Sequence, residues 1–159
     1  STLSPSSAAS DVYKRQTVFR QMMFAEFELW THESFEQGMA LTAKDYNAKW
    51  HELNVKYFGE DMIVDEDIDV EWSRIPHFFT DFYVYQYATG YAAASAFAKN
   101  ILEGKENAVE KYVGFLKSGG SDYPIEILKK AGVDMTTSEP LQATIDRFNE
   151  LLELSLIHI

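Results

Sequence analysis

One histidine and three tyrosines within the segment IPHFFTDFYVYQYATGY, residues 75–91, have side chains that could take part in catalysis. Tyr83, Tyr87 and Tyr91 recur at intervals of four residues, so they would share one face of a helix, and His77 precedes them. Phenol and imidazole groups can donate hydrogen bonds to the oxyanion that develops during acyl transfer. Judged by residue type alone, however, a tyrosine stripe is more often the edge of a hydrophobic core whose hydroxyls reach water.

Two short motifs are similar to a zinc-peptidase helix but lack its second histidine. In the segment THESFEQ, His32 and Glu33 match the motif, but the position four residues after His32 is Glu36. Such a helix needs two imidazoles four residues apart, so that both nitrogens reach the metal. Ligation by His32 and Glu36 stays open as a weaker hypothesis, which a zinc titration would test. At His51 the corresponding position is Val55, which cannot bind a metal.

Acidic residues alternate in the segment EDMIVDEDIDVE, where Asp65, Asp67 and Asp69 are similar to the start of a calcium-binding loop. An EF-hand loop needs glycine at its sixth position and glutamate at its twelfth, where this chain has Val70 and Pro76. We therefore predict a solvated acidic connector. A two-metal helical bundle is also disfavoured, because no glutamate has a histidine three residues after it.

The elements that would position these residues are helices, as judged by hydrophobic periodicity and by capping residues. Thr42 and Asp45 approximate a capping box, and Thr80 or Asp81 could cap the helix that carries the tyrosines. No stretch alternates strictly enough to predict a strand. We predict an all-α chain, with helices over about residues 17–37, 42–59, 81–104, 106–117, 121–132 and from 138 onward.

Composition narrows the class of protein further. The chain has 159 residues, enough for one domain with a sizeable core. Its net charge of −11 disfavours nucleic acid and anionic membranes as partners, because phosphate binding needs clustered Lys and Arg. No apolar run approaches the roughly 20 residues that span a bilayer, and no secretory leader is visible. The absence of cysteine fits a reducing compartment, so we expect a cytoplasmic protein.

Three longer stretches carry a family resemblance: TVFRQMMFAEFE, RIPHFFTDFYVYQYATGY and SGGSDYPIEILKKAGVDM. Together they resemble the C-terminal part of oligoendopeptidase F, a zinc metallopeptidase family related to thimet oligopeptidase. The resemblance extends over residues 17–154. It implies the C-terminal portion of a mostly helical catalytic domain, with a deep channel in which short peptides are cleaved.

The resemblance also implies which functional residues lie in this chain. In the family, zinc is held by an H-E-x-x-H helix and a later glutamate, none of which is present here, so we expect zinc only in the full-length enzyme. Glu26 and Glu28 should not be assigned as ligands instead. His77, Tyr83 and Tyr87 match the family's catalytic histidine and tyrosines, although the spacing differs by one residue from the thimet branch. Tyr91 is a weaker candidate for substrate binding.

The two ends of the chain differ from the rest. Residues 1–16 are rich in serine and lack helical periodicity, and both this stretch and residues 155–159 resemble translated sequencing adapters. We expect tails foreign to the natural protein, with the domain spanning 17–154. The alternative is a disordered N-terminal tail and a frayed last helix.

Two functions of different classes follow from these observations. The first is a fragment of a zinc oligoendopeptidase that binds short peptide substrates and the missing N-terminal part of the same enzyme, and that is inactive alone. The second is a stand-alone, metal-free helical binding module derived from such a peptidase. An H-E-x-x-H motif encoded upstream would distinguish them.

Overall fold

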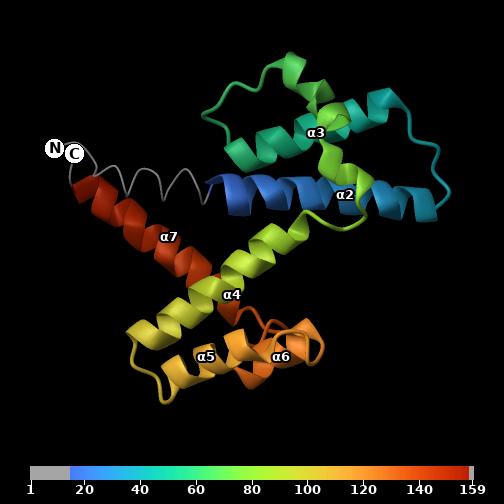
Figure 1. The fold of residues 1–159 in the computed structure, drawn as a ribbon. Helices are drawn as coiled ribbons and strands as arrows, with labels where there is room; N and C mark the ends of the chain where they lie inside the picture. Colours follow the sequence, from blue (N-terminus) through green and yellow to red (C-terminus); the bar gives the residue numbers. More distant parts are fainter. Residues whose placement is uncertain (1–14, 158–159) are drawn as a thin grey trace. The chain divides into compact units, whose positions relative to one another are not determined.

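The structure is a computed structural model that describes residues 15–157. These residues form helices and no strand, which confirms the predicted all-α fold (Figure 1). The tail expected at residues 1–16 lies almost entirely outside the described residues, as do the last two positions of the expected C-terminal tail. The elements are the π-helix η1 (Arg15–Arg20), α2 (Gln21–Glu36), α3 (Ala43–Phe58), the 3₁₀-helices η2 (Glu66–Arg74) and η3 (Pro76–Phe79), α4 (Tyr85–Leu102), α5 (Ala108–Ser118), α6 (Pro124–Lys130) and α7 (Glu139–Ile157).

The described chain folds into two compact units. Residues 15–88 form the first unit, and the residues from 89 onward form the second. Helix α4 begins in the first unit and continues into the second. Among the described residues, no helix combines the length and the apolar character that crossing a membrane requires.

The first unit is built on an aromatic core between α2 and α3, which lie side by side (Figure 1). Met23, Phe24 and Phe27 recur at helical spacing on the buried face of α2. They meet Trp50 and Leu53 of α3, neither of which exposes any surface. The Phe27 ring stands edge-on to Trp50 at a centroid distance of 4.9 Å. Such a pair contributes about 0.5–1.5 kcal/mol beyond the burial itself.

Polar contacts fix how α2 and α3 meet. Glu26 of α2 accepts hydrogen bonds from two consecutive residues of α3, from Lys56 Nζ at 2.6 Å and from the Tyr57 hydroxyl at 2.9 Å. The predicted capping box is present, because the Thr42 N–H donates to Asp45 Oδ2 at 2.8 Å. Helix α3 therefore begins at the residue after Thr42.

The acidic connector between α3 and α4 is helical at its centre. Asp65 caps η2 by accepting a hydrogen bond from the Asp67 N–H at 3.0 Å. His51 of α3 lies with Nδ1 2.7 Å from Asp69 Oδ1, so the imidazole and the carboxylate are hydrogen-bonding partners. Asp65 and Asp67 are exposed, as expected for a solvated connector.

Buried residues anchor the segment that leads from η2 to α4. Glu71 is 6% exposed, and its Oε1 accepts hydrogen bonds from Arg20 at 2.6 Å and from Arg74 at 2.9 Å. Ile75 and Val84 join the aromatic core of the first unit. The residues between Ile75 and Val84 are thus held at both ends, and they include most of the residues with predicted catalytic roles.

The second unit packs the rest of α4 against the connection that follows α6. Ala93 and Ala96 share a core with Val133, and their small side chains allow the backbones to approach closely. Lys99 of α4 pairs with Asp146 of α7 at 3.3 Å. Helices α5 and α6 lie next to each other in this unit (Figure 1).

Candidate active site

The loop before α4 carries the first of the predicted catalytic tyrosines. Helix α4 begins at Tyr85, so the prediction that this helix starts directly after Thr80 or Asp81 is wrong. Tyr83 consequently lies in the loop, whereas Tyr87 lies in the first turn of the helix.

Phe82 is the reason why the helix starts late. Its φ of 53° lies in the left-handed region, which interrupts a right-handed helix and which a bulky residue rarely adopts. Such a conformation costs on the order of 1–3 kcal/mol and persists only where neighbouring contacts hold it. Next to it, Val84 is fully buried, and the Tyr83 N–H donates to the Thr80 carbonyl at 3.2 Å.

Glu28 of α2 provides a contact that holds Phe82. The Phe82 N–H donates to Glu28 Oε1 at 2.8 Å, and the Glu28 residue is only 4% exposed. Burial raises the pKa of this carboxyl, while the hydrogen bond from Phe82 opposes the rise. One turn along α2, the His32 ring lies against the Phe82 ring with centroids 4.5 Å apart.

The structure brings His77, Tyr83 and Tyr87 together, and we call these three residues the ring cluster. The His77 ring lies nearly parallel to Tyr83, with centroids 5.8 Å apart and an interplanar angle of 16°. Tyr87 stands edge-on to both, at 6.0 Å from His77 and 5.5 Å from Tyr83. The Tyr87 hydroxyl lies 3.5 Å from His77 Nε2, at the outer limit of a hydrogen bond. All three residues lie in the first unit.

The ring cluster is accessible and can donate protons in hydrogen bonds. Tyr83 and Tyr87 are 39% and 36% exposed, so a ligand can reach their hydroxyls. Hydrogen bonding with Tyr83 raises the pKa of Tyr87 above 10, so its phenol is protonated at neutral pH. Imidazole and phenol groups side by side are suited to stabilising a developing oxyanion.

Tyr91 lies one helical turn beyond Tyr87 in α4 and is half-buried. Residues four apart on a helix are neighbours on the same face. Tyr91 belongs to the second unit, whereas the ring cluster belongs to the first.

The histidines considered as metal ligands have other contacts. His32 lies against Phe82, and His51 pairs with Asp69. Glu36, the second ligand in the alternative based on His32, is exposed. Within residues 15–157, no group of three or more histidine and acidic side chains is placed to hold a metal ion.

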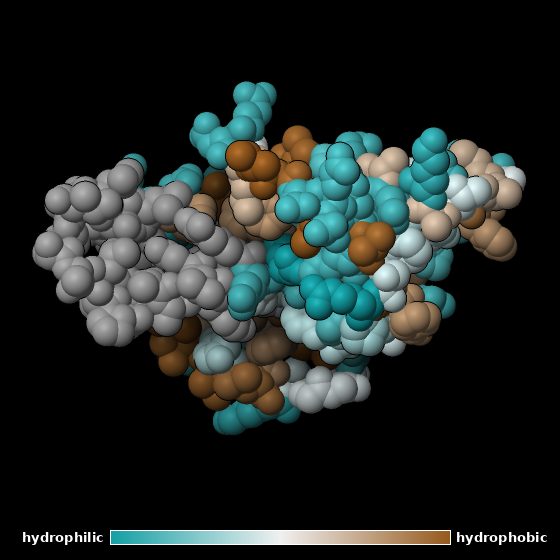
Figure 2. All heavy atoms as spheres, turned by 90° about the horizontal axis from the view of Figure 1, so that it is seen from above, coloured by the Kyte–Doolittle hydropathy of each residue, from teal (hydrophilic) through white to brown (hydrophobic). Residues whose placement is uncertain are grey.

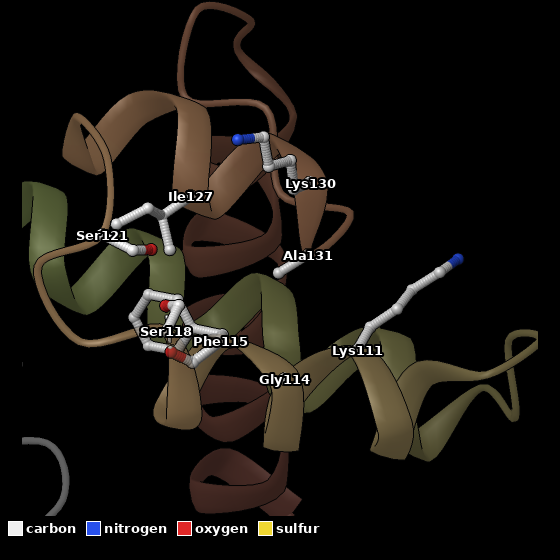
Figure 3. A pocket seen from close by; sticks show the side chains of 8 residues that line it. All are labelled: Lys111, Gly114, Phe115, Ser118, Ser121, Ile127, Lys130 and Ala131. Carbon is white, nitrogen blue, oxygen red and sulfur yellow. Dashed lines mark hydrogen bonds between the residues drawn. The ribbon is translucent and has the colours of Figure 1, made fainter.

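A separate pocket of about 280 Å³ lies between α5 and α6 in the second unit (Figure 3). Its lining includes Ser118, Ser121 and two lysines, and Figure 3 shows the Lys111 and Lys130 ammonium groups extending in different directions. Lys130 Nζ is 2.6 Å from Asp122 Oδ2, so its charge is already paired. A catalytic site requires polar groups that converge on one point. The polar groups of this pocket do not converge in that way.

Glu28 is the residue of this region whose contact could not be inferred from the sequence. Its position carried one signal, because it lies four residues after Phe24 and so shares the helix face of that buried apolar residue. A charged residue on such a face is buried only when it has a partner. The partner proved to be a backbone N–H 54 residues away, which no sequence spacing indicates.

Known proteins resemble this chain in sequence and in fold. The sequence model of Peptidase family M3 matches residues 2–147 of the chain. The chain is 52% identical over 139 residues to Oligopeptidase PepF from Bacillus subtilis, covering 87% of this chain and 21% of that protein. It is 45% identical over 141 residues to the plasmid-encoded oligoendopeptidase F of Lactococcus lactis subsp. cremoris, covering 88% of this chain and 24% of that protein.

A solved structure is similar as well. The crystal structure of oligoendopeptidase-F from Enterococcus faecium matches with a TM-score of 0.86 and 45% identity, covering 93% of this chain and 29% of that one. The chain thus spans about a fifth to a quarter of the curated relatives described above. The resemblance to oligoendopeptidase F that the motifs carry is confirmed. By the extent of the family match, the chain belongs to Peptidase family M3.

Proposed function

We propose that this chain supplies the substrate side of the active site of an oligopeptidase that hydrolyses short peptides. His77, Tyr83 and Tyr87 are its catalytic residues. The observation that carries the proposal is their assembly into one accessible ring cluster, with the Tyr87 hydroxyl 3.5 Å from His77 Nε2. The names of the relatives, oligopeptidase and oligoendopeptidase, supply the substrate class.

The ring cluster acts on the oxygen of the scissile carbonyl. When water adds to the carbonyl carbon, this oxygen becomes an oxyanion, and hydrogen bonds from the Tyr83 and Tyr87 phenols stabilise the charge. His77 lies against both rings, so it orients the phenols and adds a third polar group facing the substrate. Tyr91 of α4 stays the weaker candidate for binding the peptide.

Zinc belongs to the proposed enzyme but not to this part of it. Peptidase family M3 is zinc-dependent. The described residues do not fit the ion, because Glu28 accepts a backbone hydrogen bond and His32 lies against Phe82. The ligands then come from the part of the enzyme that this chain does not cover. When bound there, zinc would supply Lewis-acid chemistry, activating a water molecule and polarising the substrate carbonyl.

A chimera tests the proposal. This chain replaces the matching segment of the Bacillus subtilis relative, and the hydrolysis of a short fluorogenic peptide is measured. Tyr83→Phe and Tyr87→Phe each remove one hydroxyl and keep the ring. We expect each change to lower kcat by about 10²–10³-fold and to change KM little, because the lost hydrogen bond forms in the transition state.

Tyr85→Phe is the matched control, since Tyr85 is an exposed tyrosine of the same segment outside the ring cluster. It should retain the turnover of the unsubstituted chimera. Tyr91→Phe should raise KM more than it lowers kcat. Near-normal turnover in both Tyr83→Phe and Tyr87→Phe would remove the catalytic assignment and leave the tyrosines as a core edge or a binding surface.

A further inference from the structure

The left-handed conformation of Phe82 determines where Tyr83 points. Phe82 directly precedes Tyr83, and Val84 after it is fixed in the core with no exposed surface. With Val84 fixed, a change of Phe82 to an ordinary negative φ would redirect the peptide that leads into Tyr83. The near-parallel contact between Tyr83 and His77 depends on that direction.

A buried carboxylate on helix α2 supports this conformation of Phe82. Glu28 Oε1 accepts the Phe82 N–H at 2.8 Å, and Glu28 is 4% exposed although it is charged in water. An acidic side chain is seldom buried in this way unless it has a specific partner. A hydrogen bond to a carboxylate is also stronger than one between neutral groups.

The surroundings of Glu28 indicate that its oxygen matters more than its charge. The ionisable groups that affect it are His32, which favours the charged form, and Asp81, which disfavours it. Burial raises the pKa of Glu28 despite the hydrogen bond from Phe82. A neutral side chain that keeps an acceptor oxygen in the same place should therefore preserve most of this support.

We propose that Glu28 is a positioning residue, which holds Phe82 in its left-handed conformation and thereby sets Tyr83 against His77. This inference rests on the catalytic role proposed for the ring cluster. Glu28 itself touches no reacting atom in this scheme. The contact joins α2 to the loop before α4, so a helix that carries no proposed catalytic group still determines the geometry of the site.

The first test compares Glu28→Ala with Glu28→Gln in the chimera. Glu28→Ala removes the acceptor, and we expect kcat to fall about ten- to a hundredfold with KM nearly unchanged, the size of effect that a misplacement of about 1 Å produces. Glu28→Gln keeps an acceptor oxygen and should retain most of the turnover. Glu26→Ala is the matched control, because Glu26 lies on the same helix but binds Lys56 and Tyr57.

The second test restores the conformation by another route. Asparagine adopts the left-handed region far more readily than phenylalanine does. Phe82→Asn combined with Glu28→Ala should therefore recover a measurable part of the kcat that Glu28→Ala loses. A role confined to general stability would give no such recovery, so the double variant separates positioning from structural support. If Glu28→Ala alone fails to fold, Glu28→Gln decides the question, because a folded Glu28→Gln variant with a large loss of kcat would overturn the positioning role.

The outcomes distinguish this inference from the function on which it rests. If Tyr83→Phe and Tyr87→Phe lower kcat but Glu28→Ala does not, only the positioning role is wrong. Equal losses in Glu28→Gln and Glu28→Ala, without recovery by Phe82→Asn, would also overturn it, because they would show that the charge is what matters. Unchanged turnover in the tyrosine variants removes the proposed function itself.

Discussion

Tyr57 has a phenol whose pKa is strongly raised. Burial raises its pKa to about 12, and the hydrogen bond that its hydroxyl donates to Glu26 adds to the effect. The pKa in the folded protein thus exceeds the ordinary value near 10. The neutral phenol's contribution to stability is fully present below about pH 10 and is lost as the pH rises through about 12.

We therefore expect a late step in the alkaline absorbance titration of the chimera. The difference between the unsubstituted chimera and Tyr57→Phe isolates this phenol and should have a midpoint near 12. Glu26→Gln removes the carboxylate, so the midpoint should fall while staying above 10 because burial remains. A midpoint near 10 in the unsubstituted chimera would show that Tyr57 is neither buried nor bound to Glu26.

Individual site residues differ in how far the sequence predicts their positions. His77, Tyr83 and Tyr87 are close in sequence, so a turn and one helix suffice to bring them together, and the structure does so. Their chemical role stays a prediction. The contact between Glu28 and Phe82 could not be foreseen, because it joins residues 54 apart through a backbone group that every residue possesses.

At the scale of elements, capping residues predict the start of a helix correctly where only local contacts determine that start. The capping box at Thr42 and Asp45 fixes the start of α3 as predicted. Thr80 and Asp81 are capping residues of the same types as Thr42 and Asp45, but the start of α4 that they predict is wrong. A tertiary hydrogen bond holds Phe82 at a φ of 53° there, and that contact overrides the local preference.

The connection between α6 and α7 allows a test of one local contact. Asp134 accepts hydrogen bonds from the N–H and the hydroxyl of Thr136, at 3.0 and 2.6 Å, and Lys129 lies 3.1 Å away. The Thr136 hydroxyl, its N–H and Lys129 together lower the pKa of Asp134 to about 2. The stabilising contribution is therefore present above about pH 3.8 and is lost as the pH falls through about 2.

Asp134→Ala should consequently loosen this connection at neutral pH. We expect faster amide hydrogen exchange over residues 133–138 at pH 7, measured by mass spectrometry on the chimera, since the Thr136 N–H loses its acceptor. Asp146→Ala serves as the control, because Asp146 contacts Gln142 and Lys99 instead. Unchanged exchange in the Asp134 variant would show that the turn forms without the carboxylate.

At the scale of the whole molecule, the sequence predicts the helical class but not the division into two units. Trp50 and Leu53 lie three residues apart, as helical periodicity requires of residues on one face, and both are fully buried. The division into units depends on which helices pack together in one core. Hydrophobic periodicity shows which face of a helix is buried but not which other helix covers it. Helix α4, which carries Tyr87 and Tyr91, extends from one unit into the other.

The chain alone exposes apolar side chains that a folded protein normally covers. Among the described residues, Ile63 is 94% exposed, Phe79 85% and Leu102 82%. Figure 2 shows hydrophobic residues, in brown, at the surface between hydrophilic ones. Since the chain spans only 21% of the Bacillus subtilis relative, we propose that the rest of such a protein covers part of this surface.

We therefore expect the isolated chain to self-associate and to bind a hydrophobic dye more strongly, per mole of protein, than the chimera does. Its net charge of −11 opposes association at low ionic strength. Salt shortens the screening length to about 10 Å at 0.1 M, so association should increase with salt, as measured by light scattering. Phe79→Ser with Leu102→Ser should reduce dye binding in the isolated chain, whereas Glu60→Ser should not, because it removes no apolar surface. A monomer that melts cooperatively and binds no dye at any salt concentration would show that these residues need no cover.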